Sequence, residues 1–74
     1  MMTIGQAMRT AGLKAKISQA KLGALAGISP TQLCDYERDR RSPGIFNLIE
    51  LADALGLTID EYIGRKVKEE KDNG

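Results

Sequence analysis

Residues 18 to 37 limit the possible folds more than any other stretch of the chain. They read SQAKLGALAGISPTQLCDYE, and Ser18 and Ser29 each stand where an N-cap begins a short helix. Pro30 then takes the first position of the second helix, and Gln32 takes the third position, as in a capping box. The stretch therefore predicts two short helices joined by a tight turn, a shape that suits the reading of duplex DNA.

Glycines mark the ends and contacts of these two helices. Gly27 is placed to end the first of them in a left-handed C-terminal cap. Gly23 lies inside the same helix, where alanine would be the better helix former, so a neighbouring backbone must pass close to it. We expect that neighbour to be a crossing helix.

The remaining segments continue the helical pattern. Thr3 is a candidate N-cap, and apolar residues recur at helical spacing from Ile4 to Ala15, which predicts a first helix unless Gly12 ends it earlier. A fourth helix follows Pro43 and carries an apolar stripe made of Ile45, Leu48, Leu51, Ala52 and Leu55. A capping box beginning at Thr58 starts a short fifth helix. No segment alternates with period two, so we expect an all-α fold of five helices.

Composition narrows the class of protein. With 74 residues, 42% of them hydrophobic, the chain predicts one globular domain at residues 1–64 and a charged, flexible tail at residues 65–74. It shows neither a membrane span nor a signal peptide, so the expected location is the cytoplasm. One cysteine, Cys34, and no histidine leave no zinc set and no usual general base. We therefore expect no enzyme activity, no metal and no cofactor.

Charge is unevenly distributed along the chain. Residues 1–41 hold seven basic and three acidic residues, whereas residues 42–64 hold four acidic residues and no basic one. The molecule is therefore predicted to have a basic side that can face phosphates and an acidic side that limits non-specific binding.

The ordered pattern of helices resembles the phage-repressor/Cro type of helix-turn-helix domain, the XRE-like transcriptional regulators. The resemblance runs from Ile4 to about Ile63 without a gap. The matching residues are Ile4, Gly5, Arg9, Ser18, Gln19, Leu22, Gly23, Gly27, Ile28, Ser29, Leu33, Glu37, Arg41, Pro43, Leu48, Leu51, Ala52, Leu55, Gly56 and Leu57. It implies a five-helix, lambda-repressor-like fold in which the helix beginning at Pro30 is the recognition helix.

The resemblance also implies residues that contact DNA. Gln19 matches the family's phosphate-contacting glutamine beside the Ser18 cap, where free backbone N–H groups favour an anion. The arginines that follow the recognition helix, at positions 38, 40 and 41, are expected to contact phosphates: Arg38, Arg40 and Arg41. The alternative for them is pairing with Glu37 and Asp39 on a solvated surface.

Base reading is expected from the face of the recognition helix that opposes Leu33 and Tyr36. Its candidates are Ser29, Thr31, Gln32 and Asp35. Threonine can meet a thymine methyl, glutamine can pair with adenine, and aspartate can accept from the cytosine amino group. Pro30 occupies a position where the family often places a reading side chain, and it has no group for hydrogen bonding.

Two departures from the family pattern concern single residues. Many members carry an arginine, paired with the glutamate that matches Glu37, where this chain has Gly12. Glu37 must then find water, Arg9, a loop arginine or a backbone donor. The other departure is Cys34, where serine is common, and we interpret it as a small residue at a helix crossing.

Apolar residues outside the expected core predict a subunit interface. Phe46 and Ile49 lie off the main stripe of the fourth helix, at positions that the family usually leaves polar. We expect them to form a homodimer surface together with Ile59, Tyr62 or Ile63, although extra core around the tail is an alternative.

The sequence as a whole predicts a sequence-specific, DNA-binding transcriptional regulator. Repression of a palindromic operator by a homodimer is the simplest mechanism, and double-stranded DNA is the expected partner. A phage repressor, a restriction controller and an antitoxin remain open within this class. The alternative from another class is a protein-interaction module on the same scaffold, for example one that binds a partner protein as an antitoxin does, without specific affinity for DNA.

Overall fold

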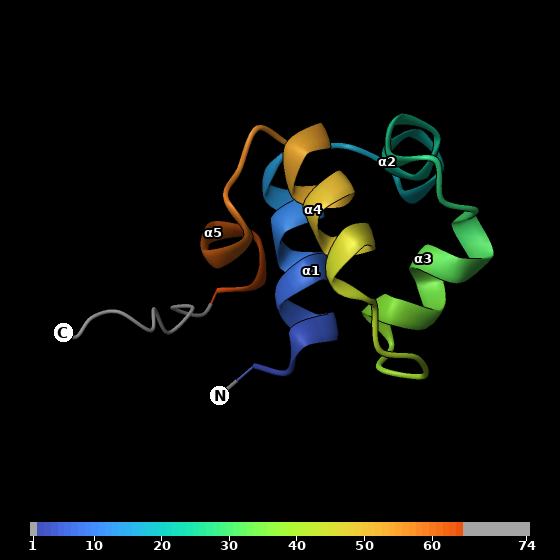
Figure 1. Ribbon diagram of the computed structural model, residues 1–74, viewed down its shortest axis with the longest axis vertical. Helices are drawn as coiled ribbons and strands as arrows, with labels where there is room; N and C mark the ends of the chain where they lie inside the picture. Colours follow the sequence, from blue (N-terminus) through green and yellow to red (C-terminus); the bar gives the residue numbers. More distant parts are fainter. Residues whose placement is uncertain (1, 65–74) are drawn as a thin grey trace, which may run out of the picture.

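Residues 2–64 are described by a computed structural model and contain five α-helices and no strand (Figure 1). Their bounds are Ile4–Lys14 (α1), Gln19–Ala26 (α2), Pro30–Glu37 (α3), Ile45–Ala54 (α4) and Ile59–Ile63 (α5). The prediction of an all-α, five-helix fold is confirmed. The predicted charged tail at residues 65–74 lies outside the described residues.

The helix starts follow the caps that the sequence contains. Thr3 and Thr58 open α1 and α5 with complete capping boxes, and Ser18 accepts a hydrogen bond from the Lys21 backbone at 3.0 Å. At α3, Ser29 accepts from the Gln32 backbone at 3.1 Å, but the Gln32 side chain does not return to the cap and instead donates to Tyr36. The predicted capping box of α3 is therefore only half formed.

The helices surround one hydrophobic core. In Figure 1, α1 and α4 lie in the middle, with α3 on one side and α5 on the other, and α1 packs against both α3 and α5. The largest fully buried side chains come from all five helices: Met8, Leu22, Leu33, Leu51 and Tyr62. None of the helices within residues 2–64 has the length and apolar character needed to cross a bilayer.

The turn between α2 and α3 is closed by contact with Gly23. Gly27 ends α2 with φ +75°, and the Ile28 backbone N–H donates to the Gly23 carbonyl at 2.8 Å. A Cβ atom built at Gly23 would collide with the carbonyl oxygen of Ile28. The close neighbour of Gly23 is therefore the turn itself, and the expectation of a crossing helix is wrong at this point.

A second close contact ties the start of α1 to the end of α3. A Cβ at Gly5 would lie 2.5 Å from the carbonyl oxygen of Tyr36, so only glycine lets the two backbones approach this closely. The Asp39 carboxylate accepts hydrogen bonds from the Thr3 hydroxyl at 2.6 Å and from the Gly5 N–H at 3.0 Å. Together these contacts fix the orientation of α3 against α1.

The two helical glycines give opposite predictions for alanine substitution. α1 continues through Gly12, where an added Cβ meets nothing within 4 Å, so Gly12→Ala should raise the free energy of unfolding by roughly 1 kcal/mol through helix propensity. Gly23→Ala should lower it by about 1–3 kcal/mol because the Ile28 carbonyl must move. Urea denaturation of both variants measures the difference, and a Gly23→Ala protein as stable as Gly12→Ala would contradict the proposed turn contact.

Candidate nucleic-acid interface

A pocket with both polar and apolar lining residues lies at the N-terminus of α2. Ser18 and Gln19, both exposed, line a pocket of about 330 Å³ together with Arg9, Gly12, Leu13, Ile17, Leu22 and Glu37. Backbone N–H groups in the first turn of a helix and a nearby arginine both favour an anion. Arg9 was not among the predicted contact residues, because the spacing of residues in the sequence does not show that α1 passes beside the start of α2.

Glu37 is the acidic residue of this pocket. Its side chain is only 9% exposed, and its Oε1 accepts a hydrogen bond from Nε2 of Gln19 at 2.7 Å. The expected partners of this carboxylate were water, Arg9, a loop arginine or a backbone donor, and the observed partner is instead the Gln19 side chain. The bond joins the first residue of α2 to the last residue of α3, and it gives the buried carboxylate a neutral partner rather than a cation.

The outward face of α3 carries the predicted reading residues. Thr31 is exposed and Gln32 and Asp35 are half-buried, whereas Leu33 is fully buried in the core. Gln32 does not oppose Tyr36 as expected, because its amide donates a hydrogen bond to the Tyr36 hydroxyl. Ser29 is also exposed, but its hydroxyl accepts the hydrogen bond that caps α3. The structure therefore brings Thr31, Gln32 and Asp35 together on one accessible surface.

Arginines from the loop after α3 lie against this surface. Arg40 and Arg41 approach the Asp35 carboxylate at 3.6 Å and 3.5 Å. The expected alternative was pairing with Glu37 and Asp39, but the ion pairs of Arg40 and Arg41 within residues 2–64 are with Asp35. Both arginine side chains are more than 60% exposed, so each pair adds little to stability and leaves the guanidinium accessible. Arg38 is exposed as well.

Several basic residues of the described chain have no acidic partner. Within residues 2–64 no ion pair is formed by Arg9, Lys14, Lys16, Lys21 or Arg38. In the same part of the chain, no group of three metal-binding side chains is placed to hold an ion. The arrangement of α2 and α3 thus offers cations and hydrogen-bond donors to an extended anion.

The exposed side of α4 carries a second candidate surface. Phe46 is 79% exposed and Ile49 is 37% exposed. Ile45 was expected in the core stripe but is 55% exposed, because it is the first residue of α4 and precedes the first buried residue of that helix, Leu48. Ile59 is half-buried and packs against the core.

Two predicted interface residues of α5 belong to the core instead. Tyr62 is 1% exposed and Ile63 is 9% exposed. Both side chains pack into the cluster that includes Met8 and Leu51. The prediction that they form part of a subunit interface is therefore wrong.

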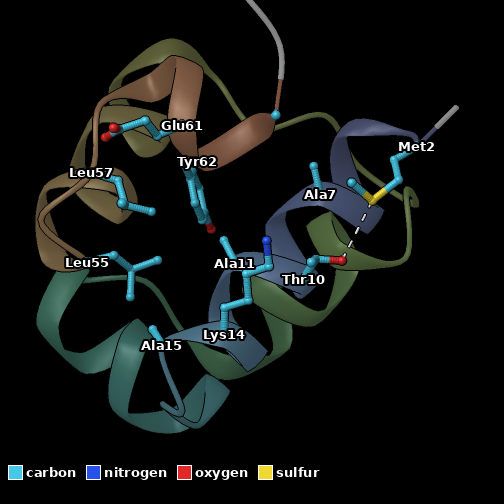
Figure 2. Close-up of a pocket in the computed structure, with 11 residues that line it drawn as sticks. Met2, Ala7, Thr10, Ala11, Lys14, Ala15, Leu55, Leu57, Glu61 and Tyr62 are labelled. Atoms are coloured by element: carbon cyan, nitrogen blue, oxygen red, sulfur yellow. Dashed lines mark hydrogen bonds between the residues drawn. The ribbon is translucent and has the colours of Figure 1, made fainter.

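A second, larger pocket lies between α1, α5 and the segment that joins α4 to α5. It has a volume of about 420 Å³ and is lined mainly by apolar side chains, among them Ala7, Ala11, Leu55 and Leu57. Figure 2 shows Tyr62 pointing from α5 toward α1 beside it. The Tyr62 hydroxyl is buried and has no hydrogen-bond partner within residues 2–64. Burial raises the pKa of this hydroxyl above its usual value, and the negative charge of Glu37 raises it further.

Comparison with known proteins relates the arrangement to repressors. The helix-turn-helix family HTH_3 matches residues 7–62. The immunity repressor protein of Bacillus phage phi105 is 35% identical over 72 residues, covering 95% of this chain and 50% of that protein. The cryptic phage CTXphi transcriptional repressor RstR of Vibrio cholerae serotype O1 is 40% identical over 53 residues, covering 72% and 47%. The chain thus spans about half the length of the curated relatives it matches.

The fold is also similar to that of a solved repressor structure. The crystal structure of the P22 c2 repressor protein in complex with a synthetic operator is 33% identical, with a TM-score of 0.76. The match covers 85% of this chain and 94% of that chain. The predicted lambda-repressor-like architecture is confirmed by this likeness.

The buried hydroxyl of Tyr62 leads to a prediction about stability. Tyr62→Phe should raise the free energy of unfolding by about 1 kcal/mol at neutral pH, because an unpaired buried hydroxyl is costly. The unfolded tyrosine ionises near pH 10 and the folded one only at higher pH, so the wild type should lose stability relative to the variant as pH rises beyond that value. Urea denaturation at pH 7 and pH 11 tests both effects, and a variant less stable than the wild type at pH 7 would contradict them.

Proposed function

Because the chain belongs to the helix-turn-helix family of repressor-like proteins, we propose that it is a sequence-specific DNA-binding regulator of transcription. The observation that carries the proposal is the joint geometry of α2 and α3. The N-terminus of α2 presents backbone donors, Gln19 and Arg9 at one end of an accessible surface, and α3 presents polar side chains along the same surface. In this arrangement α3 enters the major groove while α2 contacts the backbone.

Phosphate contacts come from the residues that frame α3. Ser18 and Gln19 contact one phosphate at the start of α2, where Arg9 adds a positive charge. Arg38, Arg40 and Arg41 contact the backbone beyond the other end of α3. For Arg40 and Arg41 this means that each guanidinium stays beside Asp35 and uses its remaining N–H donors for a phosphate oxygen.

Base contacts come from Thr31, Gln32 and Asp35. Thr31 is exposed near the start of α3 and can place its methyl group against a thymine methyl. Asp35 would repel phosphates if its charge stood alone. Its two arginine neighbours offset that charge and allow it to accept a hydrogen bond from a cytosine amino group.

A homodimer on a palindromic operator completes the proposal. The apolar patch of Ile45, Phe46 and Ile49 on α4 supplies a surface that two copies can share about a twofold axis. Two recognition helices would then reach half-sites about 34 Å apart. Occupation of a promoter in the cytoplasm would repress transcription. That step has support from the two curated relatives, both named as repressors.

Selection of duplex fragments by the purified chain tests this function. Random-sequence DNA bound at two salt concentrations should be enriched in an inverted repeat, and the affinity should fall steeply as salt rises. Light scattering on the same sample should report a dimer on DNA. If no common sequence is enriched and no salt-dependent binding occurs, the protein-interaction module becomes the better reading.

Two single substitutions separate phosphate contact from base reading. Gln19→Ala should weaken binding to all sequences alike, by roughly fivefold, the value of one lost hydrogen bond. Thr31→Ala should change which base is preferred at one position of each half-site. Selection experiments and binding curves with each variant, after circular dichroism has confirmed folding, give the comparison. A uniform loss from both variants would show that Thr31 does not read a base.

A further inference from the structure

The hydroxyl of Tyr36 lies between two amide side chains. Nε2 of Gln32 and Nδ2 of Asn47 each donate a hydrogen bond to it, both at 2.8 Å. The Tyr36 ring is in the core and the residue is 4% exposed, so the hydroxyl is held in a fixed place. The network joins the reading face of α3 to the first turn of α4.

The direction of the Gln32 bond has a consequence for recognition. A glutamine amide carries two N–H donors on nitrogen and one acceptor oxygen. When one N–H is donated to Tyr36, the oxygen and the second N–H remain, and they form the donor-plus-acceptor edge that pairs with N7 and N6 of adenine. In the reverse orientation, with the oxygen toward Tyr36, two donors would face outward and would suit the two acceptors of guanine.

We propose that Tyr36 is a specificity-determining positioning residue, which orients the Gln32 amide for adenine without touching DNA itself. The inference rests on the proposed function, since it concerns which base the same surface reads. Asn47 supports the role by fixing the hydroxyl from α4. Because the amide is oriented before DNA arrives, less conformational freedom is lost on binding.

The positions of Gln32 and Tyr36 on α3 explain how a hydroxyl in the core can orient the Gln32 amide. Gln32 and Tyr36 are four residues apart on α3, so their side chains are neighbours on one helix surface. The ring lies on the inward side of that surface, and the amide lies half-buried at its edge. A phenylalanine would fill the same core space and offer the amide no acceptor.

Selection of DNA by matched tyrosine variants tests the role. The wild type should enrich adenine at one position of each half-site. Tyr36→Phe should reduce that preference about tenfold, the size of one bidentate contact, while preferences at other positions and the salt dependence stay unchanged. Tyr62→Phe is the matched control, because it removes a buried hydroxyl that has no partner within the described residues, and its selected sequences should equal those of the wild type.

Two more variants test the same network without relying on the folding of Tyr36→Phe alone. Gln32→Ala should lose the preference at the same position, and combining it with Tyr36→Phe should cause no further loss there. Asn47→Ala keeps the tyrosine and should give a smaller loss at that position. Circular dichroism at the binding temperature confirms that each variant is folded.

Several results would overturn the inference. If Tyr36→Phe weakens binding to all sequences equally, the tyrosine is only structural. Enrichment of guanine at the position lost in Gln32→Ala would mean that the amide has the reverse orientation. A wild type that enriches no sequence refutes the proposed function itself, and this outcome is distinct from a wild type with preferences that Tyr36→Phe leaves intact.

Discussion

The close contact between Gly23 and the Ile28 carbonyl sets the angle between α2 and α3, and the rest of the surface depends on that angle. Gly5 plays the corresponding part at the other end of α3, where it lets α1 approach the carbonyl of Tyr36. Both contacts bring two backbones together closely enough that a Cβ atom would not fit between them. The hydrogen bond between Gln19 and Glu37 then joins the start of α2 to the end of α3. On the proposed function, these contacts keep the phosphate-contacting residues of α2 in a fixed relation to the base-reading residues of α3.

The three acidic residues within residues 1–41 all form ion pairs or hydrogen bonds with neighbouring residues. Asp35 is paired with Arg40 and Arg41, Glu37 accepts from Gln19, and Asp39 accepts from residues at the start of α1. Their charges are thus partly offset or turned away, whereas several lysines and arginines of the same half form no ion pair within residues 2–64. A modest net charge of +1 is compatible with a basic side because the four acidic residues of 42–64 offset the excess of basic residues in 1–41.

The sequence predicted the helices well because caps and apolar spacing are local signals. Thr3, Ser18, Ser29 and Thr58 each begin a helix where their type and position indicated. Side-chain partners were predicted less well, since they depend on how elements approach in space. Gln32 illustrates the difference: local spacing favoured a capping box, but a tyrosine hydroxyl one turn later gives its amide a partner fixed in the core.

The candidate site could be predicted as a set of residues but not as a set of interactions. A resemblance assigns Gln19 and the face of α3, yet it does not show that Gln19 is bonded to Glu37 or that Arg9 shares its pocket. For α5, the apolar residues Tyr62 and Ile63 were assigned to a surface because one turn of helix is too short for its spacing to show which face is buried. The packing of α5 against α1 decides this.

Pro30 makes the orientation of the remaining readers more important. It secures the start of α3 at the first helical position but carries no group that can hydrogen-bond to a base. On the proposed function, recognition then falls to Thr31, Gln32 and Asp35. Of these, Asp35 is restrained by two arginines and Gln32 by a buried hydroxyl. A surface with few reading groups gains specificity when those groups are oriented in advance, because a reversed amide presents a different pattern of donors and acceptors and would suit a different base pair.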